Sequence, residues 1–174
     1  MTPTAESALL DTFATQMTEA AASGSLAKMV IGEGRMLDGP SGPQPLTYAD
    51  YVASGRALTA VEDFVRDEVL PFYANTHTEG SFCGGFSTRL RAAARARIAA
   101  ACGAGPDYAT IFCGSGATAG LNRLVHLFGL REAQAAGTRP LVVVGPYEHH
   151  SNILPWRESG VEVVEIKEAS DGGP

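Results

Sequence analysis

The sequence predicts an α/β protein with a three-layer architecture: an open, mostly parallel sheet flanked by helices. Residues 141–144 form a continuous apolar run bounded by Pro140 and Gly145, as in a strand that is buried on both faces. Further β-prone runs lie at 108–113 and 161–166, and helix-like stretches near 118–134 and 151–158 separate the three runs. Short connections between alternating strands and helices imply right-handed crossovers, and such sheets bind ligands beyond the carboxyl ends of their strands.

The beginning of the chain is expected to form a helical segment separate from this sheet. Residues 6–22 predict an amphipathic helix with one apolar face, made by Leu9, Leu10, Phe13 and Met17. Residues 38–45 are rich in proline and glycine and are expected to be a connector without regular structure. We therefore expect two parts: a helix and connector at 1–45, and an α/β domain at 46–174.

Two more helices are expected before the first strand of the sheet. After an extended piece at 46–51, the first of them starts with a capping box between Thr59 and Glu62 and ends at Pro71. Residues 73–86 predict a long polar loop, and loops of this length tend to be functional. Residues 88–102 predict a helix rich in alanine and arginine, whose arginine stripe is typical of a solvated face.

Composition excludes several classes of function. Hydrophobic residues make up 45% and charged residues 18% of the 174, which suits a globular core. A net charge of −6 gives no bulk attraction to nucleic acid or to an anionic membrane. The chain has neither an apolar run of membrane-spanning length nor the basic start of a signal peptide, so we expect a cytoplasmic protein. Cys83, Cys102 and Cys113 form no CxxC pair and are expected to be reduced, mostly packed thiols.

The segment from Gly114 to Thr118 is the first candidate site. Its glycines allow a tight turn and close backbone approach, and a helix follows at once, so the free amides of the helix point toward a bound anion. The segment is predicted to hold a phosphate, although a simple strand-to-helix turn capped by Thr118 explains it equally well. It lacks the lysine of a P-loop. A dinucleotide fingerprint would need its third glycine one place away from Gly120, so a Rossmann-like domain, with Glu148 on a ribose, stays as an alternative.

The second candidate site follows the strand at 141–144. Here Glu148, His149 and His150 stand at a strand end that faces the glycine loop. A zinc site is disfavoured because adjacent histidines point in different directions and no further ligand completes a set, so we expect no metal. An imidazole stacked on a planar cofactor is the other interpretation. His126 and Trp156 are expected to be packing residues.

Together, these segments resemble the first half of a class-V aminotransferase, a family of fold-type-I pyridoxal-phosphate enzymes that includes the cysteine desulfurases. The resemblance covers roughly residues 46–166 and is most specific from Glu148 to Trp156. It implies that Gly116, Ala117 and Thr118 hold the cofactor phosphate, and that His149 stacks on the pyridine ring and assists proton transfer. It places Asn75 and His77 near the site entrance. It also implies an amino-acid substrate and a homodimer.

Two departures limit the reaction that the resemblance implies. Many relatives have a glutamate where this chain has Ala119, which weakens a strict assignment as a desulfurase. Pyridoxal-phosphate chemistry needs a lysine for the Schiff base, and neither Lys28 nor Lys167 has a matching context. We therefore expect the chain to be an N-terminal portion that is inactive by itself. A non-catalytic truncated relative is the remaining alternative.

Overall fold

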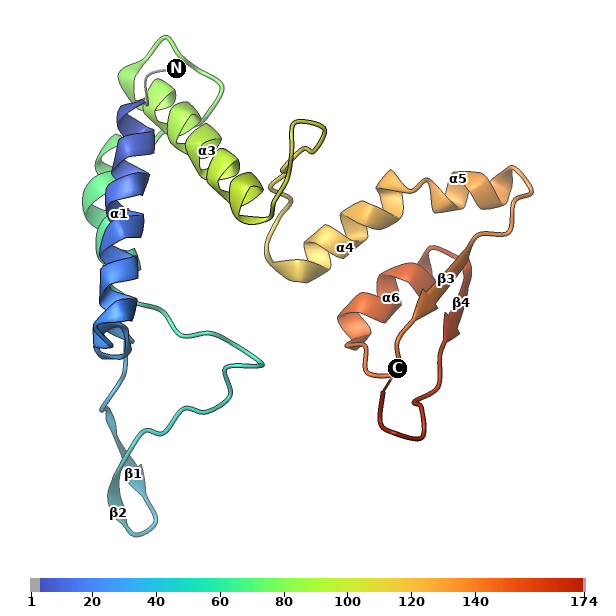
Figure 1. Cartoon of the computed structure of the whole chain (residues 1–174), viewed down its shortest axis with the longest axis horizontal. Coiled ribbons are helices and arrows are strands. Elements are labelled where there is room, and N and C mark those ends of the chain that lie inside the picture. The colour runs from blue at the N-terminus through green and yellow to red at the C-terminus, as the bar shows by residue number, and fades with distance from the viewer. Residues whose placement is uncertain (1–3, 174) are drawn as a thin grey trace. The chain divides into compact units, whose positions relative to one another are not determined.

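The computed structural model describes residues 4–173, which divide into two compact units: unit 1 ends at Thr110, and unit 2 begins at Ile111. Figure 1 shows unit 1 from blue to green and unit 2 in yellow, orange and red. The helix-and-strand composition agrees with the α/β class. The boundary expected at residues 45/46 stays a prediction.

Two long helices form the frame of unit 1. The predicted N-terminal helix is confirmed as α1, Ala5–Ala22, and the Thr4 side chain caps it by accepting a hydrogen bond from the Ser7 amide at 3.2 Å. It packs against α3, Phe82–Ala101 (Figure 1). Ion pairs join the two helices, from Glu6 to Arg89 and from Asp11 to Arg97. Charged side chains thus connect α1 and α3 along their length.

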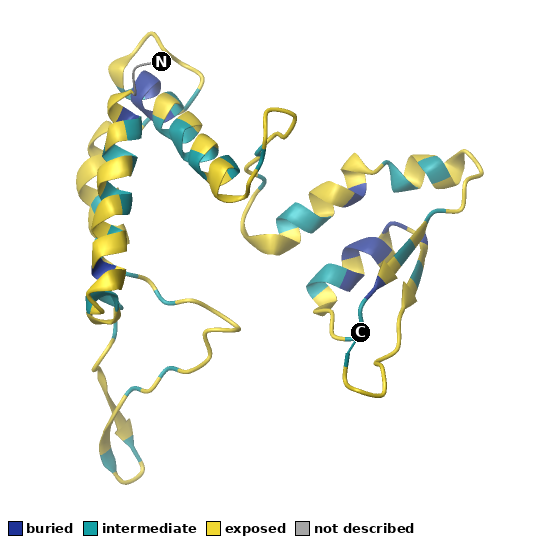
Figure 2. Ribbon diagram, viewed as in Figure 1, coloured by how far each residue is buried: buried dark blue, intermediate teal, exposed yellow. Residues whose placement is uncertain are grey.

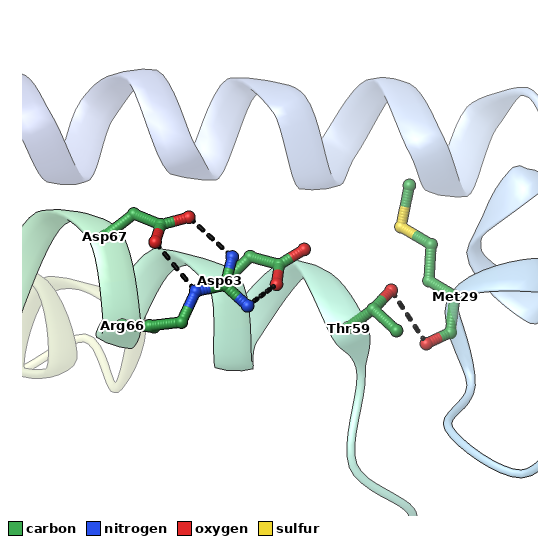
Figure 3. Close-up of polar contacts among 5 residues, drawn as sticks. All are labelled: Met29, Thr59, Asp63, Arg66 and Asp67. Carbon is green, nitrogen blue, oxygen red and sulfur yellow. Dashed lines mark hydrogen bonds and ion pairs between the residues drawn. The ribbon is translucent and has the colours of Figure 1, made fainter.

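The helix predicted to begin at Thr59 forms, but its capping box is wrong. In α2, Thr59–Phe64, the N-cap is Leu58, and the Thr59 hydroxyl instead donates to the carbonyl of Met29 at 3.3 Å (Figure 3). Thr59 therefore ties the helix start to the 3-10 turn at Ser25–Met29 rather than capping the helix. The predicted capping box placed the N-cap at Thr59, one residue after the N-cap in the structure.

Helical structure continues beyond α2 as a π-helical turn, Val65–Val69, and a 3-10 turn, Leu70–Phe72. Arg66 lies between two carboxylates, with nitrogen–oxygen distances of 2.8 Å to Asp63 and 2.7 Å to Asp67 (Figure 3). The Asp67 carboxylate raises the pKa of Arg66, and Arg66 in turn lowers the pKa of Asp67. All three side chains are largely exposed, so water screens this pair and its effect on stability is small.

The connector at 38–45 was expected to lack regular structure, and this expectation is wrong. Met36–Gly39 (β1) and Gly42–Pro45 (β2) form an antiparallel hairpin. The Leu46 amide donates to the Arg35 carbonyl at 2.7 Å. Backbone amides alternate in direction along a strand, so those of the even-numbered residues of β2 point toward β1. The backbone nitrogens of Pro43 and Pro45 then point away from β1, on the side of the edge strand where no amide donor is needed. The alternation of prolines along β2 therefore permits pairing.

Unit 2 is a parallel βαβ unit with two further helices. Its elements are α4 (Gly116–Leu127), α5 (Leu130–Ala135), β3 (Leu141–Val144), α6 (His150–Glu158) and β4 (Glu162–Glu165). The strands at 141–144 and 161–166 are confirmed, the second slightly shorter than predicted, and they pair in parallel. The single helix predicted at 118–134 is instead two, because Gly129 adopts a left-handed conformation with φ +58°.

A small core holds unit 2 together. Its centre is a cluster of buried residues, to which α4, β3 and α6 contribute: Val125, Val144, Ile153 and Trp156. Figure 2 shows these buried positions on α6 and on the adjoining end of β3. Along β3, Val142 and Val144 pack toward this core while Leu141 and Val143 are exposed, so the helices cover only one face of the sheet.

The strand predicted at 108–113 is wrong for this structure. The segment is not part of any strand in the range 4–173, where the sheets are the pairs β1–β2 and β3–β4. A β-prone run becomes a strand only when another backbone pairs with it, and the sequence pattern does not reveal that partner. The open three-layer sheet thus stays a prediction. Within the described part of the chain, no helix is long and apolar enough to cross a membrane.

Candidate functional site

The glycine-rich turn before α4 is shaped by two left-handed residues. Gly114 has φ +64° and Gly116 has φ +73°, a region that L-residues rarely adopt. Nothing lies within 4 Å of the place where a Cβ on Gly116 would stand, so the backbone there is open to an approaching group. The prediction of a turn leading into a helix is confirmed. The strand expected to precede it is absent, as described above.

The first turn of α4 leaves its amides without a side-chain cap. Ser115 occupies the N-cap position, and its side chain makes no capping hydrogen bond. Thr118, the alternative cap expected from the sequence, instead lies inside α4 and accepts a hydrogen bond from the Asn122 side chain at its carbonyl oxygen, at 2.8 Å. The free amides and the positive end of the helix dipole can therefore bind an anion.

A cavity lies beside this turn. Its volume is about 440 Å³, and it is lined by Ile111, Phe112, Cys113, Gly114, Ala119, Asn122, Arg123 and His126. His126 is exposed on this cavity, so the expectation that it is a packing residue is wrong. Trp156, by contrast, is confirmed as a core residue. Cys113 lines the cavity and Cys102 is exposed, so the thiols are less packed than expected.

His149 caps α6 with its own side chain. Its Nδ1 accepts a hydrogen bond from the Ser151 amide at 3.2 Å and lies 2.8 Å from the Ser151 hydroxyl oxygen. Because a backbone N–H can only donate, Nδ1 carries the lone pair, and the neutral ring holds its proton on Nε2. The His150 ring stacks on one face of the His149 ring, with centroids 4.4 Å apart.

The glycine turn and His149 belong to neighbouring elements of unit 2. Helices α4 and α6 pack side by side across the core cluster and run in the same direction, so their N-termini lie at the same end of the unit (Figure 1). Gly116, Ala117 and Thr118 open α4 at that end, and His149 opens α6 there. The parallel pairing of β3 with β4 through α6 accounts for the place of His149, because the crossover helix starts beyond the carboxyl end of β3.

Asn75 and His77 lie in unit 1, in an exposed loop that precedes α3. The loop predicted at 73–86 is shorter than expected, because the Ser81 side chain caps α3 by accepting from the Gly84 amide at 3.1 Å. His77 has φ +72°, which is unusual for a residue with a side chain. Its amide donates to the Thr88 hydroxyl at 3.1 Å, and the Ala74 amide donates to the Ser87 hydroxyl at 3.0 Å.

Sequence reasoning missed the hydrogen bonds that hold the His149 turn. The Asn152 side chain donates to the Glu148 carboxylate and accepts from the indole N–H of Trp156. Glu148, Asn152 and Trp156 lie four apart in the sequence, and this spacing was the available signal. Among residues 4–173, no three His, Cys, Asp or Glu side chains gather as a metal site would require.

Comparison with known proteins identifies related chains. A family model described as class-V aminotransferase matches residues 47–173. The cysteine desulfurase of Serratia proteamaculans is 32% identical over 114 residues, which cover 66% of this chain and 27% of that relative. A probable cysteine desulfurase of Pseudomonas aeruginosa is 33% identical over 113 residues, covering 65% and 27% of the two chains.

A more distant relative gives the same picture. A probable cysteine desulfurase of Halalkalibacterium halodurans is 28% identical over 123 residues, which cover 71% of this chain and 29% of the relative. The chain thus spans between 27% and 29% of the length of these curated relatives.

Proposed function

Because this chain belongs to the class-V aminotransferase family, we propose that it forms the phosphate-binding and ring-stacking part of a pyridoxal-phosphate enzyme that acts on an amino acid. The observation that carries this proposal is the uncapped N-terminus of α4 beside the turn that ends in His149. Both lie at one end of unit 2, as a cofactor with a phosphate and an aromatic ring requires.

The glycine turn fits the phosphate of this cofactor. The amides of Gly116, Ala117 and Thr118 belong to the first turn of α4, where they have no acceptor within the helix. The Thr118 hydroxyl adds a fourth donor in the same turn. A phosphate carries two negative charges at neutral pH, which the helix dipole favours at this position.

His149 fits the ring of the cofactor. One face of its imidazole is covered by His150, and the cap to Ser151 fixes the ring by its Nδ1 atom. The proton on Nε2 is then available for transfer or for a hydrogen bond. When bound, pyridoxal phosphate supplies an electron sink that stabilises negative charge at the α-carbon of an amino acid.

The reaction itself is proposed only as a class. The relatives are named cysteine desulfurases, so desulfuration of an amino acid is one candidate and transamination the other. We propose that neither Lys28 nor Lys167 anchors the cofactor, because Lys28 lies in the 3-10 turn Ser25–Met29 and Lys167 follows β4. By itself, this chain is then inactive. We also propose a cytoplasmic homodimer whose loop with Asn75 and His77 lies near the entrance of the site.

Pyridoxal phosphate binding by the full-length protein tests this proposal. We expect a yellow protein, and we expect His149→Asn, whose side chain still caps α6, to reduce turnover about 100-fold because the ring is lost. The matched control is His126→Asn, which changes another exposed imidazole of unit 2 in the same way and is expected to leave turnover within a few-fold. A colourless protein that binds NAD or ATP would instead favour the Rossmann-like alternative.

A further inference from the structure

Three consecutive side chains hold the turn that leads into α6. The Tyr147 hydroxyl donates to the Gly172 carbonyl at 3.2 Å, Glu148 accepts from Asn152, and His149 accepts from Ser151. The carboxylate of Glu168 raises the pKa of Tyr147 above its ordinary value. The turn is thus bound to the first turn of α6 through Ser151 and Asn152, and to the segment after β4 through Gly172.

The first turn of α6 needs such support because Pro155 lies inside the helix. Proline has no amide hydrogen, so the carbonyl of Ser151 loses its usual partner four residues on. The amides of Asn152 and Ile153 donate to the His149 carbonyl in this turn, at 2.7 Å and 3.3 Å. Side-chain bonds that span Pro155 therefore contribute more than they would in an uninterrupted helix.

Asn152 makes one side-chain bond across Pro155, to Trp156, and a second in the opposite direction, to Glu148. Its Nδ2 donates to Oε2 of Glu148, and its Oδ1 accepts from Nε1 of Trp156 at 3.2 Å. An indole N–H can only donate and a carboxylate can only accept, so the amide of Asn152 has one allowed orientation. Trp156 is only 9% exposed and belongs to the core cluster of unit 2. The chain of contacts thus connects the core to Glu148.

We propose that Asn152 is a positioning residue for His149: it ties Glu148 to the buried Trp156 and so fixes the turn that presents the imidazole. The cap from His149 to Ser151 is local and fixes the ring only relative to the first turn of α6. The contacts of Asn152 fix that turn relative to the core. This inference rests on the proposed role of His149 as the residue that stacks on the cofactor.

The test is carried out on the full-length protein without cofactor. Nitrogen-15 NMR of the His149 ring reports the position of its proton, and hydrogen exchange of the Ser151 amide reports the cap. In Asn152→Ala and Glu148→Ala we expect the amide to exchange about tenfold faster and the ring to show a mixture of tautomers, because the turn is released. Glu148→Gln is expected to behave as the wild type, because its side-chain oxygen still accepts from Asn152.

A second pair of variants separates positioning from simple stability. Asn152→Asp keeps the acceptor for Trp156 but faces Glu148 with a like charge, so it is expected to resemble Asn152→Ala. Ile153→Val removes a core methylene group from the same helix, and we expect it to lower the melting temperature without changing the ring signal. An unchanged ring signal in Asn152→Ala, or the same ring change in Ile153→Val, would overturn the inference.

The cofactor gives an independent readout. In wild-type protein and in Glu148→Gln, added pyridoxal phosphate is expected to give the same absorption maximum, whereas Asn152→Ala shifts it because the stacked ring has moved. If wild-type protein fails to bind pyridoxal phosphate, the proposed function is wrong, while the ring and amide measurements still decide whether Asn152 positions His149. An identical absorption maximum in Asn152→Ala would contradict the inference alone.

Discussion

At the scale of single residues, the ion pair between Glu6 and Arg89 is the clearest electrostatic feature of unit 1. The Glu6 side chain is only 6% exposed, and both Nε and Nη2 of Arg89 lie 2.9 Å from its Oε1. The hydrogen bond from Arg89 outweighs the effect of burial and lowers the pKa of Glu6 below its ordinary value of 4.5. A charged Glu6 is therefore favoured in the folded state.

This shift predicts how stability depends on pH. A carboxylate whose pKa is lower in the folded state stabilises the fold above its unfolded-state pKa, and this contribution is lost as pH falls through the folded-state pKa. We expect the urea midpoint of the wild type to exceed that of Glu6→Gln at neutral pH and to converge with it in acid. Glu19→Gln, on an exposed position of the same helix, should parallel the wild type. A constant gap between wild type and Glu6→Gln at all pH values would contradict this.

Residue-level prediction from the sequence succeeded where one side chain's chemistry decided the outcome. The glycine turn before α4 and the buried Trp156 follow from backbone freedom and apolar size. Prediction failed where a residue distant in the sequence determined the contact that a side chain makes. The Thr59 side chain could cap a helix, yet its hydroxyl donates a hydrogen bond to the carbonyl of Met29, thirty residues earlier.

At the scale of elements, the close approach between α3 and the loop before it can be tested by adding a single methyl group. A Cβ on Gly84 would stand 2.3 Å from the backbone oxygen of Thr78, so the backbone itself would have to move. We expect Gly84→Ala to destabilise unit 1 by about 1–3 kcal/mol, measured by urea unfolding. Loss of stability should be accompanied by faster cleavage of the loop that carries His77.

A matched glycine in another helix gives the opposite expectation. Gly120 lies inside α4, and nothing is within 4 Å of its would-be Cβ. Gly120→Ala should therefore raise stability by roughly 0.5–1 kcal/mol, because alanine loses less backbone entropy in a helix. Equal effects of the two substitutions would show that the contact with Thr78 is not what restricts Gly84.

Prediction of helices and strands likewise succeeded where the pattern within one segment was sufficient and failed where a second segment had to be known. Amphipathic periodicity located α1, and an apolar run located β3, but the burial on both faces that this run predicted is wrong, because Leu141 and Val143 are exposed. The hairpin of β1 and β2 was not predicted, because proline content alone does not show whether a proline nitrogen faces the partner strand or solvent. The run at 108–113 has strand composition but no pairing partner in the described residues, and composition alone does not supply one.

At the scale of the whole molecule, net charge and exposed apolar surface act together. The chain carries −6 at neutral pH and has an isoelectric point near 5.2. Leu141 and Val143 are 56% and 57% exposed on the open face of the β3–β4 pair. Charge repulsion keeps such surfaces apart at neutral pH and disappears near the isoelectric point.

We therefore expect light scattering to rise to a maximum near pH 5.2, where the net charge vanishes. Val143→Lys, which places a charge on the open face, should lower that maximum without reducing the melting temperature. Val144→Lys is the control, because it puts the charge in the core and should unfold unit 2. Scattering that is independent of pH would argue against association through this face.

The topology of unit 2 has a consequence for the order in which the chain folds. β3, α6 and β4 follow one another between Leu141 and Glu165, and each residue of β3 pairs with a residue of β4 that lies 21 positions later, as Leu141 does with Glu162. Closing this crossover costs entropy before the strand pairing repays it, and parallel pairing is slow for that reason. We therefore expect packing of α6 on β3 to precede the pairing with β4, so that substitutions of Ile153 and Val144, which join this helix to this strand, slow refolding most.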